Sequence, residues 1–234
     1  MSLDRRAFVL EHTRLQRPPH VPEIRLHLAT QIEPIWRQTE EELQQRGLDP
    51  PFWAFAWAGG QALARYLLDH PGEAAGRRVL DLATGSGIVA IAAAKAGAAD
   101  VLAADIDPFC DAAVALNAEA NGVGIGFTGE NLLDRPPPDA DLICAGDVCY
   151  ARPLADQVWP WLRAAQARGS RVLIGDPGRA YLPREGLARL ARYQVATTRE
   201  LEDREVRDTA VFTLAEDVAS LDLPGTGPAP LLAQ

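Results

Sequence analysis

The sequence predicts an α/β fold: a seven-stranded, mostly parallel sheet with a terminal antiparallel hairpin and an N-terminal helical extension. From residue 77 onward, short apolar runs alternate with longer helical stretches, a pattern that implies βαβ crossovers. The last two apolar runs are joined only by the charged segment EDRE, so they should pair as an antiparallel hairpin. At 234 residues the chain can form one sizeable core and is too short for two full cofactor domains.

The sequence predicts three parts. Residues 1–50 form the N-terminal helical extension, with a helix expected around 33–47 that ends at Gly47. Residues 51–215 form the catalytic domain, which opens with a helix that ends near Pro71. Residues 216–234 are rich in Pro, Gly and Ala without a period, and we expect a mobile tail.

The remaining elements follow in order from the apolar periodicity. We expect strands at 77–83, 100–106, 125–130, 141–147, 171–176, 194–201 and 206–214, and helices at 87–96, 108–120, 154–167 and 184–192.

Composition narrows the function classes. The net charge of −9 disfavours a nucleic-acid partner and suits a basic protein segment. The three cysteines form no C-x-x-C pair and the four histidines show no metal-ligand spacing, so no metal site is expected. No apolar run is long enough to span a membrane, and the N-terminus lacks a signal sequence. We therefore expect a cytoplasmic protein, monomeric, with no membrane or nucleic-acid partner.

A glycine turn follows the first strand of the catalytic domain. Gly85-Ser86-Gly87-Ile88-Val89-Ala90 satisfies G-x-G-x-x-[GA], and Asp105 lies where an acid can bond a ribose. By itself the motif is compatible with NAD, with S-adenosylmethionine, or with a structural turn that needs glycine for positive φ.

Three further features favour S-adenosylmethionine over NAD. Asp81 ends the first strand, where its carboxylate can receive an ammonium group but would repel a pyrophosphate. Too few strands follow Asp105 for a second nucleotide-binding half. The terminal hairpin is foreign to the dinucleotide fold but typical of the seven-strand methyltransferase sheet.

Asp147-Val148-Cys149-Tyr150 marks the expected chemistry. It follows the strand 141–147, and ligands of open parallel sheets gather beyond the carboxyl ends of strands. Adenine-amine and glutamine methyltransferases place N-P-P-[YF] or D-P-P-[YF] here, whereas an acid and a tyrosine suit a cationic lysine. We expect Asp147 to orient the amine and stabilise its charge after transfer, and Tyr150 to wall the lysine channel. The alternative for Asp147 is a helix cap, since Pro153 follows closely.

The motifs resemble a known family. PFWAFAWAGGQALARYLLDHP, VLDLATGSG, ADIDP with Asn117, GDVCY and VLIGDPGRAYLP together resemble the lysine methyltransferases of the electron transfer flavoprotein β-subunit. The resemblance covers residues 20–214 and departs from the usual pattern at Ala58 and Ala83. It implies a Rossmann-like class I methyltransferase fold, S-adenosylmethionine as cofactor and the flavoprotein β-subunit as protein substrate. Alternatives are methylation of another protein, such as a ribosomal protein, or of a small amine, and a non-catalytic cofactor-binding module.

The candidate site residues belong to three groups. Asp147 and Tyr150 are expected at the reaction centre; the expected cofactor residues are Trp57, Asp81, Ala83, Gly85, Gly87, Asp105, Ile106, Glu130, Asn131 and Asp147, and the expected substrate residues are Trp53, Asp176 and Arg179. Several alternatives stay open. Trp53 can pack in the core instead, Glu130 and Asn131 can belong to a solvated loop, and Arg179 can pair with Asp176 or with an acid of the substrate. Asp107 is the rival of Asp105, but Pro108 after it favours a helix cap.

Overall fold

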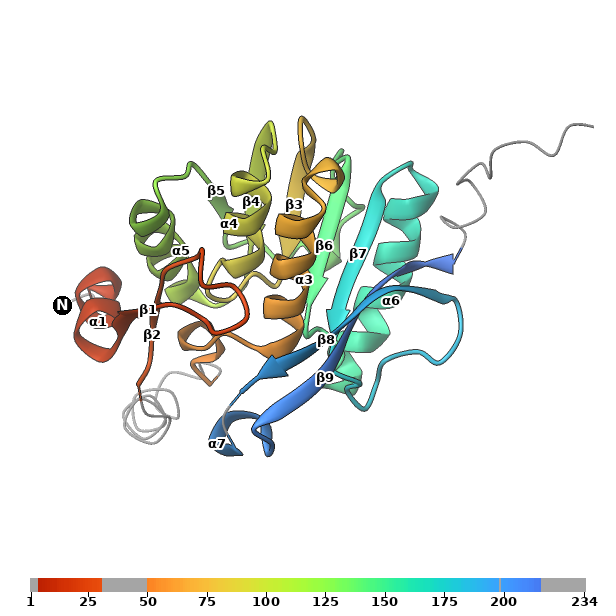
Figure 1. Ribbon diagram of the computed structural model, residues 1–234. Coiled ribbons are helices and arrows are strands. Elements are labelled where there is room, and N and C mark those ends of the chain that lie inside the picture. The colour runs from red at the N-terminus through yellow and green to blue at the C-terminus, as the bar shows by residue number, and fades with distance from the viewer. Residues whose placement is uncertain (1–3, 31–49, 198, 216–234) are drawn as a thin grey trace, which may run out of the picture.

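The computed structural model describes residues 4–30, 50–197 and 199–215. Its main sheet has seven strands in the order β5-β4-β3-β6-β7-β9-β8, as Figure 1 shows. β3 to β7 are parallel, while β9 is antiparallel to both β7 and β8. The predicted seven-stranded sheet with a terminal antiparallel hairpin is therefore confirmed. The helix expected at 33–47 and the tail 216–234 lie outside the described residues.

The elements have the following bounds. The strands of the main sheet are β3 (Arg78–Leu82), β4 (Asp100–Ala104), β5 (Gly126–Thr128), β6 (Leu142–Gly146), β7 (Arg171–Asp176), β8 (Leu187–Ala196) and β9 (Val206–Leu214). The helices are α1 (Arg5–His12), α3 (Ala58–Asp69), α4 (Ile88–Lys95), α5 (Pro108–Asn121), α6 (Arg152–Ala167) and α7 (Arg199–Glu202), with short 3-10 turns at Phe52–Ala54, Pro71–Glu73 and Leu132–Asp134.

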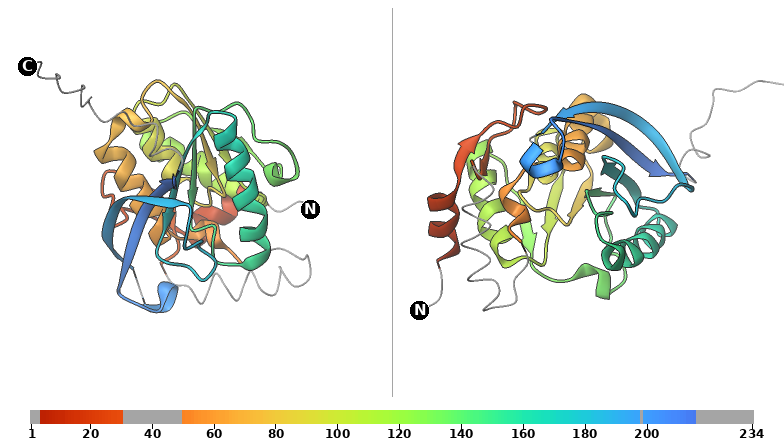
Figure 2. Two further views of the ribbon diagram at one scale, coloured as in Figure 1. Left: turned by 90° about the vertical axis from the view of Figure 1, so that its right-hand side faces the viewer. Right: turned by 90° about the horizontal axis from the view of Figure 1, so that it is seen from below.

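The central strands are buried on both faces. Alternate residues of β3 illustrate this: Val79 packs with α3 and α4, and Leu80 packs with α6 on the opposite face. Figure 2 (right) shows α3 and α6 on opposite sides of the sheet. Parallel strands covered on both faces read as continuous apolar runs, which is why the sequence pattern located them. Within the described ranges, no helix combines the length and apolarity needed to cross a bilayer.

The prediction of a helix at 184–192 is wrong. Strand β8 begins within this range, at Leu187, and pairs with β9 as far as Ala196, with one irregularity between Arg189 and Ala191. Leu, Ala and Arg favour helices, but cross-strand pairing along the whole of β9 overrides that weak preference. The strand expected at 194–201 accordingly ends at Ala196, and the short helix α7 lies in the connection that was expected to be a simple charged turn.

The N-terminal extension contains more than helix. α1 is followed by a two-stranded antiparallel sheet of β1 (Arg14–Gln16) and β2 (Leu26–Leu28). Asn117, fully buried on α5, ties this hairpin to the core: its Oδ1 accepts from the His27 N–H at 2.6 Å and its Nδ2 donates to the Ser86 carbonyl at 2.8 Å. The extension thus bonds, through one side chain, to the glycine turn.

Candidate active site

A cavity of about 530 Å³ opens at the carboxyl ends of β3, β4 and β6. It brings together most of the sequence-predicted site residues: Trp53, Trp57, Asp81, Ala83, Gly85, Asp105, Ile106, Glu130, Asn131, Asp147, Tyr150 and Arg179 all line it. Gly87 and Asp176 are outside this lining. Residues more than 100 positions apart in the sequence meet here because parallel strands end at one edge of the sheet.

The glycine turn after β3 contains three residues in the left-handed region. Ala83, Gly85 and Gly87 have φ of 55°, 51° and 80°. A side chain at Gly87 would also place a Cβ 3.2 Å from the Cγ2 atom of Val114, so this glycine packs the turn against α5. Ala83 adopts a conformation that costs an L-residue free energy, and it does so at the cavity wall.

Asp81 hydrogen-bonds the glycine turn and the helix that follows it. Its Oδ2 accepts from Thr84 Oγ1 at 2.5 Å and from the Ala90 N–H of α4 at 3.0 Å. Burial raises the pKa of this carboxyl to about 7, against the lowering effect of these two hydrogen bonds. The carboxyl thus joins β3, the turn and α4, and it also borders the cavity.

Asp105 lies at the carboxyl end of β4. Its Oδ2 accepts from the Gly85 N–H at 2.9 Å and its Oδ1 from the Asp107 N–H at 3.0 Å, so two backbone groups fix the carboxylate at the cavity. Asp107 accepts from the Phe109 N–H and caps α5, as the sequence predicted. Ile106 is 61% exposed although apolar, which leaves its side chain available to contact a ligand.

Glu130 and Asn131 border the same end of the cavity. Glu130 forms an exposed ion pair with Arg135 at 2.8 Å. Asn131 caps the turn Leu132–Asp134 by accepting from the Leu133 N–H at 3.2 Å. Both side chains therefore have local partners, and both lie within reach of a ligand in the cavity.

Asp147 follows β6 with φ of 56° and is buried. Its Oδ2 accepts from the Gly60 N–H of α3 at 2.9 Å, and its Oδ1 accepts from Arg179 Nε and Nη2 at 3.1 and 2.7 Å. Burial raises its pKa to about 6, although the Arg179 guanidinium acts in the opposite direction. The residue at the N-cap of α6 is Ala151, so the alternative in which Asp147 caps the following helix is wrong.

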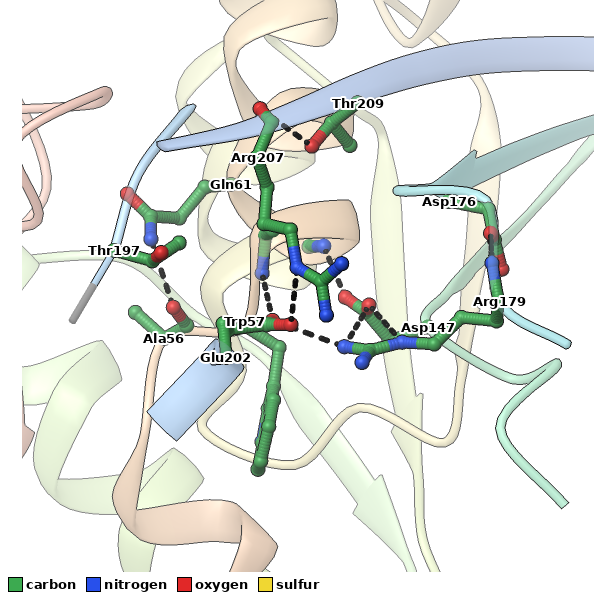
Figure 3. A network of polar contacts seen from close by, with 12 residues as sticks. Ala56, Trp57, Gln61, Asp147, Asp176, Arg179, Thr197, Glu202, Arg207 and Thr209 are labelled. Atoms are coloured by element: carbon green, nitrogen blue, oxygen red, sulfur yellow. Dashed lines mark hydrogen bonds and ion pairs between the residues drawn. The ribbon is translucent and has the colours of Figure 1, made fainter. Parts of the chain in front are cut away.

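Arg179 bridges two acids, and Figure 3 shows this network. Its Nη2 donates to Asp147 and, at 2.9 Å, to Oε1 of Glu202, whose side chain is fully buried. The same Glu202 oxygen accepts from the Ala58 N–H at 3.3 Å, and its other oxygen accepts from Arg207 Nε at 3.2 Å. Two acids from different elements therefore hold the first turn of α3.

Glu202 was not among the predicted site residues. It lies in the connection between β8 and β9 among several other acids, and nothing in the local pattern separates it from a solvated charge. Its partner Ala58 is 144 positions away, so only the fold reveals the contact.

A close approach of backbones places α3 at this edge. A Cβ on Gly175 of β7 would lie 2.1 Å from the Gly59 carbonyl oxygen, and a Cβ on Gly146 of β6 would lie 3.1 Å from Gly60. Glycine at these positions lets the first turn of α3 lie directly on the strand ends. The Gly60 N–H can then reach Asp147.

Aromatic side chains form one wall of the cavity. Trp57 donates its Nε1–H to the Phe52 carbonyl at 2.9 Å, and the Arg179 guanidinium lies 5.6 Å from the Trp57 ring centre. Tyr150, 49% exposed, lies 5.5 Å from the Phe52 ring. This wall can surround an aliphatic or cationic side chain.

Two of the expected substrate residues, Trp53 and Asp176, are almost fully buried. Trp53 is 1% exposed and stacks on Phe109 with 5.7 Å between ring centroids, so most of its surface is core packing. Asp176 is equally buried and accepts from the Gly178 and Arg179 N–H groups at 2.7 Å. The Arg179 side chain bonds Asp147 and Glu202 instead of Asp176.

Comparison with known proteins shows similarity to protein methyltransferases. The family model of ribosomal protein L11 methyltransferase (PrmA) matches residues 61–157. A solved ribosomal protein L11 methylase from Lactobacillus delbrueckii subsp. bulgaricus superposes with a TM-score of 0.50 and 26% identity, over 71% of this chain and 83% of that one.

Curated relatives match about nine tenths of the chain, and two of them illustrate this. The electron transfer flavoprotein beta subunit lysine methyltransferase of Xenopus laevis is 43% identical over 214 residues, which covers 89% of this chain and 86% of the relative. The protein of the same name from Danio rerio is 38% identical over 216 residues, covering 89% and 83%. The chain therefore belongs to the family of electron transfer flavoprotein β-subunit lysine methyltransferases.

Proposed function

We propose that this protein is an S-adenosylmethionine-dependent lysine N-methyltransferase that acts on the electron transfer flavoprotein β-subunit. The observation that carries the proposal is one cavity with two chemically different ends. The glycine turn and Asp105 lie at one end, and Asp147, Tyr150 and the aromatic wall lie at the other. The relatives' names supply the substrate, and the net charge of −9 suits a basic protein segment.

The residues of the first end fit S-adenosylmethionine. The cavity volume of about 530 Å³ lies in the range typical of small-ligand sites. Asp105, oriented by two backbone N–H groups, is suited to accept hydrogen bonds from ribose hydroxyls. The exposed Ile106 can pack on the adenine face, with Glu130 and Asn131 at its polar edge. When bound, the cofactor supplies a methyl group activated by a sulfonium.

The residues of the second end must receive a neutral amine. A free lysine has a pKa of about 10.4, so presenting the uncharged amine at pH 7 costs about 4 to 5 kcal/mol. Partial desolvation against Phe52, Trp57 and Tyr150 lowers that cost. The amine would lose its proton to water before transfer. S-adenosylmethionine, held by the glycine turn and Asp105, would supply the methyl group, whose bond to sulfur breaks as the bond to nitrogen forms. Asp147 stabilises the positive charge on nitrogen after transfer.

The test is transfer of a labelled methyl group to purified flavoprotein, followed by mass spectrometry of the β-subunit. We expect lysine methylation with the natural protein and a severe loss with Asp147→Ala. A cofactor-binding module without activity would show no difference between the two. If label is absent from the β-subunit but present on another protein of a lysate, that other protein is the substrate and the proposed substrate is wrong. The ribosomal protein L11 is the first alternative, because the PrmA model matches the cofactor half of the domain.

A further inference from the structure

A buried cation, Arg179, lies at the end of the cavity where the substrate is proposed to bind. Arg179 lines the cavity with a side chain only 16% exposed, and it is bonded to Asp147 and Glu202 at the same time. The other titratable groups near it are Asp176 and Cys149, and Arg207 lies on the far side of Glu202. Asp147, Arg179, Glu202 and Arg207 therefore form a series of alternating charges that sum to zero, and burial raises the pKa of the neighbouring Asp176 carboxyl toward its neutral form.

This cancellation bears on the chemistry of the amine. An isolated carboxylate beside a lysine favours the ammonium form, which has no lone pair and cannot attack a methyl group. A guanidinium bonded to that carboxylate removes most of this effect while leaving the carboxylate oxygens in place. Arginine suits the role, because it stays protonated at any pH at which the enzyme works.

We propose that Arg179, held in place by Glu202, is the counter-charge of Asp147 and lets the substrate lysine enter as a free amine. Glu202 is the positioning residue: it is fully buried, comes from α7 between β8 and β9, and bonds both the guanidinium and the first turn of α3. The terminal hairpin thereby contributes to the reaction centre. The inference rests on the proposed lysine methylation and adds the electrostatic arrangement that makes it work near neutral pH.

The test is the pH dependence of the initial methylation rate on the flavoprotein β-subunit between pH 6.5 and 10. Arg179→Gln leaves Asp147 without its counter-charge while Glu202 keeps Arg207, so the profile should move to higher pH by about one unit. The rate should then be roughly tenfold lower at pH 7 and approach that of the natural protein at pH 10. Arg179→Lys keeps the charge and should leave the profile near its original position. Asp147→Asn should move it to lower pH, and Arg179→Gln with Asp147→Asn should bring it back.

The matched control is Arg192→Gln, which removes an exposed ion pair with Asp208 on the same hairpin. It should change neither rate nor profile. A circular dichroism spectrum and a melting temperature, measured on every variant, verify that each one is folded. A loss in Arg179→Gln by the same factor at every pH would indicate a structural role and overturn the inference. If Arg179→Gln does not fold, an unchanged profile in Asp147→Asn overturns it instead. Failure of the natural protein to methylate the β-subunit at any pH would overturn the proposed function, and this inference with it.

Discussion

Replacing Ala83 by glycine should stabilise the protein, although glycine usually destabilises a structured segment. Ala83 has φ of 55°, in a region that costs an L-residue roughly 1–2 kcal/mol relative to glycine. The greater freedom of glycine in the unfolded chain returns about 0.4–1 kcal/mol of that gain. The Ala83 side chain is exposed, so loss of its methyl group removes little packing. The net expectation is a gain of about 0.5–1 kcal/mol.

Urea denaturation at constant pH measures this change. We expect a higher midpoint with an unchanged slope, and a melting temperature a few degrees higher, since about 1 kcal/mol corresponds to 2–4 °C for a domain of this size. Ala104→Gly is the matched control, because Ala104 pairs with Leu82 at the same edge but lies buried in a strand. It should lose about 1 kcal/mol. An Ala83→Gly protein less stable than the parent, with the same slope, would refute the argument from backbone strain.

Three further predictions concern the same edge of the sheet. Gly175→Ala places a Cβ 2.1 Å from a backbone oxygen and should cost at least 1–3 kcal/mol in urea, whereas Gly126→Ala, with 3.6 Å to its neighbours, should be milder. Asp105→Ala should weaken S-adenosylmethionine binding at least tenfold in calorimetry, because two backbone donors and the ribose lose their acceptor. Asp81, whose pKa rises to about 7 on folding, stabilises the fold in its protonated form, so this contribution should be complete below pH 4 and lost as pH rises through 7. Urea denaturation at pH 5 and pH 8 should show that the free energy of unfolding changes less with pH in Asp81→Asn than in the parent. An equal change in both proteins would contradict the assignment of this pH dependence to Asp81.

The parallel part of the fold was predictable because its signals are local. β3, β4, β6 and β7 are buried on both faces, and such strands stand out as apolar runs bounded by turns. β8 gave no such signal: all of its residues except Val195 are exposed or partly exposed, and most of them favour helix. Its strand conformation comes from pairing with β9, which lies later in the sequence.

The same distinction applies to the site. The location of Gly85 and Asp105 at the cavity was predictable because it follows from their position relative to a strand and a turn. The direction of a side chain and its partners were not. Arg179 was expected to meet Asp176 or a substrate acid, and it meets Asp147 and Glu202 because α3 and α7 converge on the end of β6. A buried charge pairs according to packing, and packing between distant segments leaves no mark on the local sequence pattern.

Asp147 hydrogen-bonds both α3 and the cavity residue Arg179. One of its oxygens anchors α3 through the Gly60 N–H, and the other holds Arg179 at the cavity. In the proposed reaction, a substrate lysine entering beside Asp147 meets a carboxylate that accepts three hydrogen bonds and keeps one acceptor site on Oδ2. The pKa of Asp147, about 6, lies far below that of a free lysine, about 10.4, so the carboxylate is a weak base for the amine's proton. We therefore expect the carboxylate to accept a hydrogen bond from the nitrogen and to balance the positive charge that appears there, while the proton leaves to water. The requirement for a neutral amine therefore falls on the surroundings of Asp147, which is where Arg179 and Glu202 lie.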